Sequence, residues 1–182
     1  DIPYYVLDYT ESFSKNVVDN FIDMYAQGLT PNPCVECNRS VKFDHFLNQA
    51  KKLNCEKVAT GHYAKIIKNE NFYELHKADY LDKDQSYVLH MLKSDDLENI
   101  LFPLGEITKP EVRQIAARLG LKTAFKKDSQ DICFVGKKDY RSFVEKRIDL
   151  TSAGEIFDVN GNKVGNHNGI HEFTVGQRKG LP

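Results

Sequence analysis

The segment Phe43-Asp-His-Phe-Leu-Asn-Gln-Ala-Lys-Lys-Leu53, followed by Lys57-Val-Ala-Thr-Gly-His62, decides the fold class. Apolar residues recur at helical spacing up to Leu53, and Val58-Ala59 is a short apolar run typical of a buried strand. A helix that leads into a strand ending at Gly is typical of an α/β sheet, in which ligands bind beyond the carboxyl ends of the strands. We therefore predict an α/β fold with Gly61 and His62 at a strand end.

On the N-terminal side, residues 1–8 are predicted to form a strand, and Thr10 is predicted to begin a helix. The apolar residues of that helix share one face, and Gly28 ends it as a left-handed cap. Two prolines then exclude a regular helix, since proline fixes φ and lacks an N–H group. This places the N-terminus of the next helix at Cys37.

On the C-terminal side, residues 63–67 and 72–76 alternate in polarity and predict a hairpin, and residues 86–92 predict a helical stretch. Thr108 and Glu111 form a capping box that begins a further helix. We expect this helix to bury four apolar residues, Val112, Ile115, Ala116 and Leu119.

The amino-acid composition changes near Leu150. The remainder is rich in glycine, and Asn160-Gly161 indicates a hairpin turn. We therefore predict one domain over residues 1–150 and the start of a small β-rich domain over residues 151–182.

The composition is that of a globular protein, with 41% hydrophobic and 28% charged residues among 182 and a formal net charge of −1. No global positive field indicates nucleic acid, although local basic clusters leave that open. No stretch approaches the roughly 20 apolar residues that a membrane span needs. Four cysteines without a secretory signal favour reduced thiols. We therefore expect a cytoplasmic protein, or one in an organelle of similar redox state, without membrane contact.

Cys34-Val-Glu-Cys37 is the clearest local motif. It can be half of a zinc site, a dithiol redox pair, or a reactive thiol with a neighbour. At a helix N-terminus, N–H groups would favour the thiolate form of Cys37. Cys133, between Ile and Phe in a loop expected to run into a strand, would by itself be a core residue, and Cys55 is expected to be structural.

Six segments together are more specific than any one of them. In chain order they are Gly28-Leu-Thr-Pro-Asn-Pro-Cys-Val-Glu-Cys-Asn-Arg39, Ala59-Thr-Gly-His-Tyr63, Lys83-Asp-Gln-Ser-Tyr87, Phe102-Pro-Leu-Gly105, Lys127-Asp-Ser-Gln-Asp-Ile-Cys-Phe134 and Gly176-Gln-Arg-Lys-Gly180. Along almost the whole chain, this series closely resembles the tRNA-specific 2-thiouridylase family.

The resemblance implies an adenine-nucleotide α-hydrolase-like domain of the PP-loop type, incomplete over residues 1–150. It implies an enzyme that uses ATP with magnesium to adenylate the wobble uridine of a tRNA anticodon and then replaces the carbon-2 oxygen with sulfur. By motif position Cys37 matches the family's nucleophile. Cys133 matches the persulfide carrier, loaded by a sulfur-donor protein. The two thiols would therefore have to meet in the fold.

Binding roles carry over in the same way. Asn32, Pro33 and Cys34 match the loop that meets the target base. Gly61 matches an ATP contact. The matches to tRNA contacts are His62, Lys83, Asp84 and Gln85.

The chain departs from the family pattern at two points. The family's Ser-Gly-Gly-x-Asp-Ser phosphate loop does not occur in these 182 residues, and the family's C-terminal barrel would lie beyond Pro182. We therefore expect a fragment that is inactive alone and binds ATP poorly. Some members carry Asp where this chain has Cys34, which leaves open an iron–sulfur cluster held by Cys34, Cys37 and Cys133. An alternative from another class is a noncatalytic zinc-binding module that uses Cys34 and Cys37.

Overall fold

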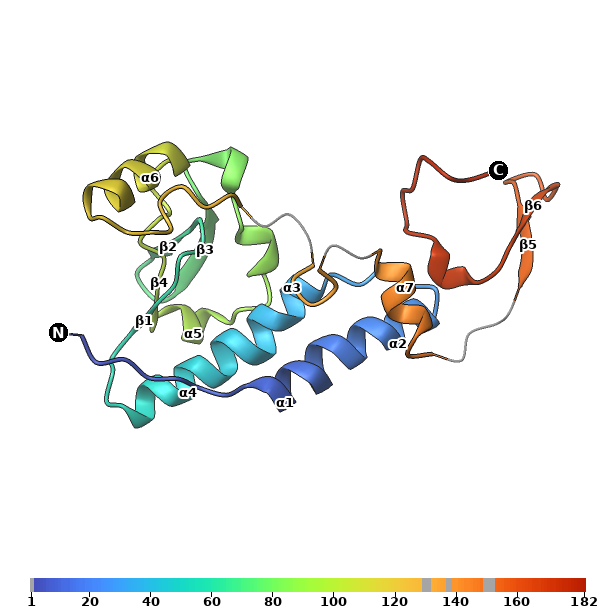
Figure 1. Ribbon diagram of the computed structural model, residues 1–182. Coiled ribbons are helices and arrows are strands. Elements are labelled where there is room, and N and C mark those ends of the chain that lie inside the picture. The colour runs from blue at the N-terminus through green and yellow to red at the C-terminus, as the bar shows by residue number, and fades with distance from the viewer. Residues whose placement is uncertain (1, 129–131, 137–138, 149–152) are drawn as a thin grey trace. The chain divides into compact units, whose positions relative to one another are not determined.

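The computed structural model describes residues 2–128, 132–136, 139–148 and 153–182 (Figure 1). It divides into two compact units, the first formed by Asp1–Pro33 with Gln130–Pro182 and the second by Cys34–Ser129. We describe each unit by itself.

A long helix leads into the second unit. Its consecutive parts are α3 (Pro33–Glu36), the π-helical η2 (Cys37–Phe43) and α4 (Asp44–Lys52). The helix thus begins at Pro33, and the predicted start at Cys37 is wrong. Proline is favourable at the first position of a helix, because its φ is already helical and the missing N–H has no intrahelical acceptor there.

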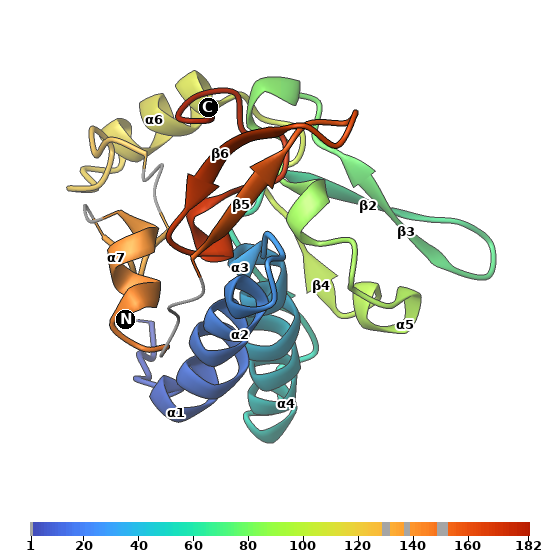
Figure 2. The ribbon, with the colours of Figure 1, turned by 90° about the vertical axis from the view of Figure 1, so that its right-hand side faces the viewer.

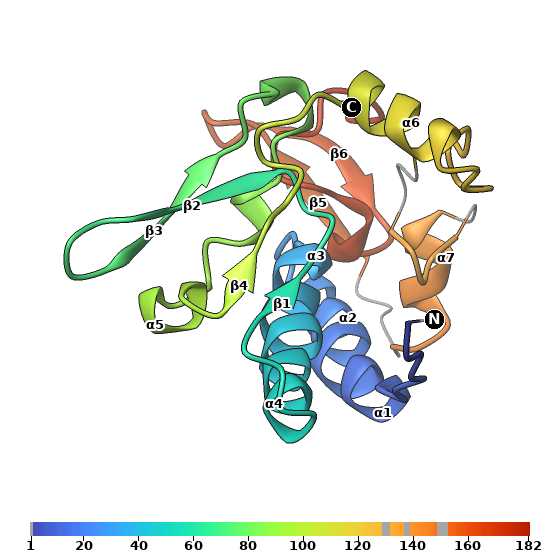
Figure 3. The same cartoon turned by 90° about the vertical axis from the view of Figure 1, so that its left-hand side faces the viewer.

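The strand that follows α4 is β1 (Val58–Ala59), which pairs in parallel with β4 (Ile100–Leu101) (Figure 3). A parallel pair requires a crossover connection, and the intervening chain supplies it. Val58 and Ile100 are buried together with Phe43 and Ala50 of the long helix. The predicted α/β arrangement of helix and buried strand is confirmed.

The predicted hairpin is confirmed as β2 (Ala64–Lys68) and β3 (Tyr73–Lys77), joined antiparallel. The predicted helical stretch over residues 86–92 is confirmed only at its start, where the 3-10 helix η4 (Ser86–Val88) forms. The remaining short elements of this region are η3 (Leu81–Lys83) and α5 (Ser94–Leu97). Side chains that hydrogen-bond to nearby backbone compete with a regular helix. Asp84 does so, accepting from the backbone N of Ala78 at 2.8 Å.

The predicted capping box begins α6 (Lys109–Arg118): the backbone N of Thr108 donates to Glu111 Oε2 at 2.8 Å, and Thr108 Oγ1 accepts from the backbone N of Glu111. Gly120 follows the helix with φ +68°, as expected of a left-handed residue there. The expected burial is wrong, since none of the residues of α6 is buried and Leu119, just beyond it, is 67% exposed. Helical spacing shows that an apolar face exists, but not that a neighbour covers it.

The first unit contains α1 (Thr10–Phe13), the π-helical η1 (Ser14–Asp19), α2 (Asn20–Ala26) and α7 (Tyr140–Glu145). Its core joins Phe21 and Tyr25 of α2 to Val144 of α7, and Tyr25 stacks on Tyr140 with ring centroids 4.7 Å apart. The predicted helix beginning at Thr10 is confirmed, with its apolar face inward.

The strand predicted over residues 1–8 is not found in the described part, residues 2–8. Ile2, Tyr4 and Val6 are 93%, 87% and 80% exposed. A strand needs a neighbour for its backbone hydrogen bonds, and no described segment pairs with this one.

The expected C-terminal hairpin is confirmed as β5 (Gly154–Phe157) and β6 (Lys163–His167) (Figure 2). The turn is held by Asp158, whose Oδ1 accepts from the backbone N of Asn160 at 2.8 Å and of Asn162 at 2.9 Å. The short helix η5 (Ile170–Glu172) follows. In the described ranges, no helix has the length and apolar character that a membrane span requires.

Candidate functional site

The structure brings together two segments that the sequence placed at the site. The backbone N of Gln85 donates to the carbonyl O of Tyr63 at 2.8 Å, and the backbone N of Tyr63 donates to Gln85 Oε1 at 3.0 Å. The segments Gly61–Tyr63 and Lys83–Gln85 are therefore adjacent, just beyond the carboxyl end of β1. Both belong to the second unit.

Gly61 is exposed at this strand end, and a Cβ added there would come no closer than 3.8 Å to Leu104. The position therefore leaves room for a ligand such as a nucleotide. The described residues contain no glycine-rich loop that leads into a helix, which is the usual cradle for phosphates. Gly61 thus lies exposed at the strand end, and its contact with a nucleotide stays a prediction.

His62 is buried, with only 8% of its surface exposed. Its ring packs between Phe43 and Phe102, with centroids 5.9 Å away in each case, and its Nδ1 is 2.8 Å from Thr60 Oγ1. Burial, and to a lesser degree the nearby ammonium of Lys42, lower the pKa of His62 from 6.5 to about 4. His62 is therefore a packed, neutral side chain near pH 7.

Asp84 has a structural task. One carboxylate oxygen accepts from the backbone N of Ala78, and the other accepts from Ser86 Oγ at 2.7 Å. Both oxygens thus hold the turn that carries Lys83 and Gln85.

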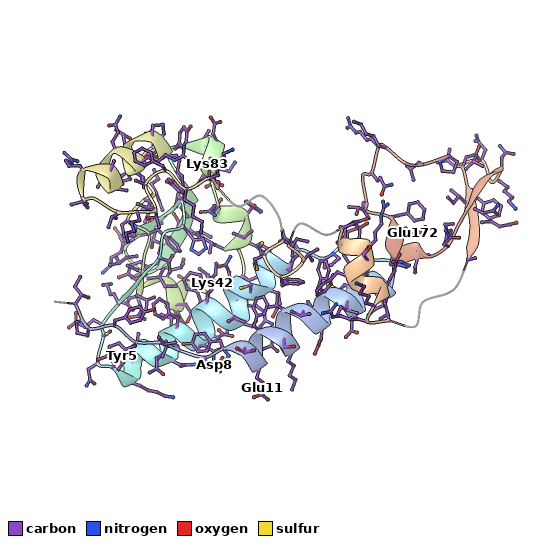
Figure 4. All side chains as sticks on the ribbon, viewed as in Figure 1. Tyr5, Asp8, Glu11, Lys42, Lys83 and Glu172 are labelled. Carbon is purple, nitrogen blue, oxygen red and sulfur yellow. The ribbon has the colours of Figure 1, made fainter. Side chains whose placement is uncertain are left out.

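Lys83, which is labelled in Figure 4, forms an ion pair with Asp128, a residue to which the sequence analysis gave no role. Lys83 Nζ lies 2.9 Å from Asp128 Oδ2, while Lys109 Nζ and Arg113 Nη2 lie 3.2 Å and 3.6 Å from Oδ1. Hydrogen bonding to Lys83, and then to Lys109, lowers the pKa of Asp128, and the same carboxylate raises the pKa of Lys83.

A local signal for part of this cluster was present in the sequence. Lys109 and Arg113 are four residues apart and thus share one face of α6. Nothing local indicated that Asp128 and Lys83 would meet them.

The Cys34–Cys37 motif lies at the start of the long helix, with Cys34 exposed and Cys37 half-buried. The first turn of a helix holds its unsatisfied N–H groups, and the structure places Cys34 in that turn, whereas Cys37 lies beyond it. Cys37 is instead the first residue of the π-helical segment. Such segments occur frequently at functional sites.

The other residues of this loop are also placed. Asn32 is exposed and Pro33 is buried at the helix start. Glu36 and Arg39 form a two-pronged ion pair, with Arg39 Nη2 and Nε at 2.6 Å and 3.2 Å from the two carboxylate oxygens.

Cys133 is exposed, whereas its neighbours Ile132 and Phe134 pack against the core of the first unit. The ring of Phe134 meets that of Phe21 edge-on at 5.3 Å. The segment is a turn, closed by a 3.1 Å hydrogen bond from the backbone N of Val135 to the carbonyl O of Ile132, so the expected strand and core placement of the thiol are wrong. The two apolar neighbours occupy the core and leave the thiol outside.

Cys55 is exposed in the turn after α4, where its backbone N donates to the carbonyl O of Ala50 at 2.8 Å. Cys34 and Cys37 belong to the second unit and Cys133 to the first, so the meeting of these thiols stays a prediction. Across the described residues, no group of three His, Cys, Asp or Glu side chains is arranged to hold a metal ion.

A helix that enters a parallel strand pair, with the site beyond the strand end, is typical of an α/β domain, and the hairpin of β5 and β6 follows it in the chain. A family model described as tRNA methyl transferase HUP domain matches residues 1–137, and one described as tRNA methyl transferase PRC-barrel domain matches residues 141–182.

Relatives with curated names point to a different reaction from the methyl transfer in those descriptions. The chain is 49% identical over 181 residues to the tRNA-specific 2-thiouridylase MnmA of Rickettsia peacockii, covering 99% of this chain and 50% of the relative. It is 50% identical over 184 residues to the protein of the same name from Chloroflexus aurantiacus, covering 99% and 51%. The chain belongs to the tRNA-specific 2-thiouridylase family. It spans about half the length of the curated relatives it matches.

The predicted division after residue 150 falls within residues 149–152, which lie outside the described part. It stays a prediction.

Proposed function

We propose that this chain contributes to ATP-dependent transfer of sulfur to carbon 2 of the wobble uridine in a tRNA anticodon, in the cytoplasm. The observation that carries the proposal is the exposed thiol of Cys133 between two side chains anchored in the core. A thiol that must accept sulfur from a donor protein and pass it on has to be accessible. Membership of the 2-thiouridylase family supplies the reaction class.

The chemistry requires both thiols. Attack of the uridine carbon-2 oxygen on the α-phosphorus of ATP, with magnesium bound, releases pyrophosphate and converts a poor leaving group into AMP. The terminal sulfur of a Cys133 persulfide then bonds to carbon 2, and AMP departs. The Cys37 thiolate attacks Cys133 Sγ and breaks the sulfur–sulfur bond, which leaves sulfur on the base and a Cys37–Cys133 disulfide. A two-electron thiol reductant restores both cysteines.

Gly61 is proposed to contact the nucleotide, and Asn32, Pro33 and Cys34 to meet the target base. Lys83 and Gln85 are proposed as direct tRNA contacts, since both side chains are partly exposed on the surface beyond β1. His62 and Asp84 support these contacts from inside, because His62 is buried and both oxygens of Asp84 are engaged.

The test uses three serine variants of the full-length protein. Cys37→Ser and Cys133→Ser are expected to abolish 2-thiouridine, while Cys55→Ser, which changes a thiol in an exposed turn, is the matched control and keeps wild-type levels. Thiolated tRNA is measured by its retardation in a mercury-containing gel. Wild-type product from either of the first two variants would refute the proposal.

The iron–sulfur alternative has its own outcome. Metal analysis of anaerobically purified protein would find iron with sulfide if Cys34, Cys37 and Cys133 hold a cluster. Zinc bound without thiolation activity would support the noncatalytic module. A metal-free protein that thiolates tRNA would support the persulfide route.

A further inference from the structure

Residues 106–128 are basic in a chain that is slightly acidic overall. This stretch carries six Lys or Arg residues against three Asp or Glu, whereas the whole chain has a net charge of −1. One of the three acids, Glu111, already caps α6 by accepting from Thr108. The positive charge is therefore concentrated on α6 and the segment that follows it.

The same stretch encloses a cavity of about 370 Å³ between α6 and residues 123–128. Five of its lining residues are charged, namely Lys109, Arg113, Lys126, Lys127 and Asp128. Four of these are cations and one is an anion. The cavity is thus shaped and charged to receive an anion.

Asp128 arranges these cations without neutralising them. Its single carboxylate lies within 3.6 Å of Lys83, Lys109 and Arg113, which leaves an excess of positive charge around it. The side chains of Lys109 and Arg113 are 28% and 46% exposed, so both remain within reach of a ligand. Cations preorganised by a buttressing carboxylate lose less conformational freedom when a ligand binds.

A buried hydroxyl beside this cluster is without a partner. Tyr63 is 4% exposed, its Oη makes no hydrogen bond within the described residues, and Lys109 Nζ lies 5.6 Å from its ring centroid. Burial raises the pKa of Tyr63 and the Asp128 carboxylate adds to this, so the hydroxyl keeps its proton as a donor.

We propose that the cavity between α6 and residues 123–128 binds a backbone phosphate of RNA, with Lys109 and Arg113 as its main ligands. Guanidinium and ammonium groups together suit a phosphate, since Arg supplies a planar fork and Lys a point charge. None of the lining residues is aromatic, so the cavity has no platform for the base of a free nucleotide.

The identification of that RNA as the tRNA substrate rests on the proposed function. Lys83, which is proposed to contact tRNA, shares Asp128 with Lys109 and Arg113. The phosphate site would therefore extend the same RNA-binding surface onto α6.

The experiment compares Arg113→Gln with Arg118→Gln in the full-length protein. Both changes remove one cation from α6, but Arg118 neither lines the cavity nor pairs with Asp128. Filter binding of tRNA is measured over a series of salt concentrations, and ATP binding is measured by calorimetry. Circular dichroism melting checks that both variants fold.

Arg113→Gln is expected to weaken tRNA binding roughly tenfold and to reduce the slope of log affinity against log salt by about one. Arg118→Gln is expected to match the wild type in affinity, and neither change alters ATP binding. Equal tRNA affinity and salt slope for the two variants would overturn the phosphate site. Weaker ATP binding by Arg113→Gln with an unchanged tRNA slope would overturn it too, by assigning the cavity to the nucleotide.

The outcome is separable from that of the proposed function. Suppose that Arg113→Gln weakens tRNA binding as expected but the wild-type protein forms no 2-thiouridine. That result would refute the sulfur-transfer proposal and leave the phosphate site standing. Conversely, suppose that the wild-type protein thiolates tRNA while Arg113→Gln and Arg118→Gln bind tRNA equally tightly. That result would refute the phosphate site and leave the sulfur-transfer proposal standing.

Discussion

Replacement of His62 by Asn should make the protein less sensitive to acid. The wild-type ring is neutral in its pocket between Phe43 and Phe102, and burial lowers its pKa to about 4. In the unfolded chain a histidine binds a proton near pH 6.5, so the unfolded state takes up more protons between pH 6.5 and 4. Stability is therefore lost as the pH falls through that window.

The size of the loss follows from the two pKa values. Between pH 7 and pH 5, a shift from 6.5 to about 4 corresponds to a loss of about 2 kcal/mol in the free energy of unfolding. His62→Asn removes this proton-linked contribution and can retain a hydrogen bond to Thr60 Oγ1. It should also lower stability at pH 7, because the ring contacts with the two phenylalanines are lost.

The measurement is urea unfolding of the wild type, His62→Asn and His90→Asn at pH 7 and pH 5. His90 is exposed, so its replacement serves as a control for the loss of an imidazole at the surface. Carboxylates whose pKa is lowered in the folded state change the free energy of unfolding mainly below pH 5, outside the measured range. An NMR titration of the His62 ring in the folded protein gives its pKa directly.

Two results would refute the reasoning. One is an equal change in unfolding free energy between pH 7 and pH 5 for the wild type and His62→Asn. The other is a titration midpoint of the His62 ring near 6.5, which would mean that water reaches the imidazole in the folded state.

Three further predictions concern stability and are each checked by denaturant unfolding. Gly105→Ala should destabilise by about 1–3 kcal/mol, because an added Cβ would clash with the backbone carbonyl O of Ala64, and a wild-type midpoint would show that the loop yields. Thr108→Ala should cost about 1 kcal/mol through loss of the capping box with Glu111, and an unchanged midpoint would mean that water replaces the cap. Phe21→Ala should cost about 3–5 kcal/mol, since the ring is fully buried, and a loss below about 1 kcal/mol would contradict its place in the core.

Features that depend on neighbours in the chain were predictable from the sequence. The cap formed by Thr108 and Glu111, the hairpin turn at Asn160-Gly161 and the end of a helix at Gly28 all rest on hydrogen bonds and φ angles within a few residues. The helix containing Phe21 and Tyr25 was predictable for the same reason, because its spacing reports the face directly.

Features that depend on contacts with distant parts of the chain were not predictable. Helical spacing on α6 indicated an apolar face, yet Leu119 at its end is largely exposed, and the apolar residues 2–8 found no strand partner among the described residues. His62 was identified as a site residue at a strand end, but its burial depends on Phe102, which lies far along the chain.

By itself, the sequence determined the α/β class and, through its series of motifs, the family; its assignment of Cys37 and Cys133 to the chemistry stays a prediction. Only the tertiary structure decided that Cys133 is held outward by its neighbours, and that Asp128 gathers Lys83, Lys109 and Arg113. The physical reason is that a motif reports residue types and local backbone geometry. Burial and ion pairing are set by side chains that folding brings from distant positions, and no local spacing encodes them.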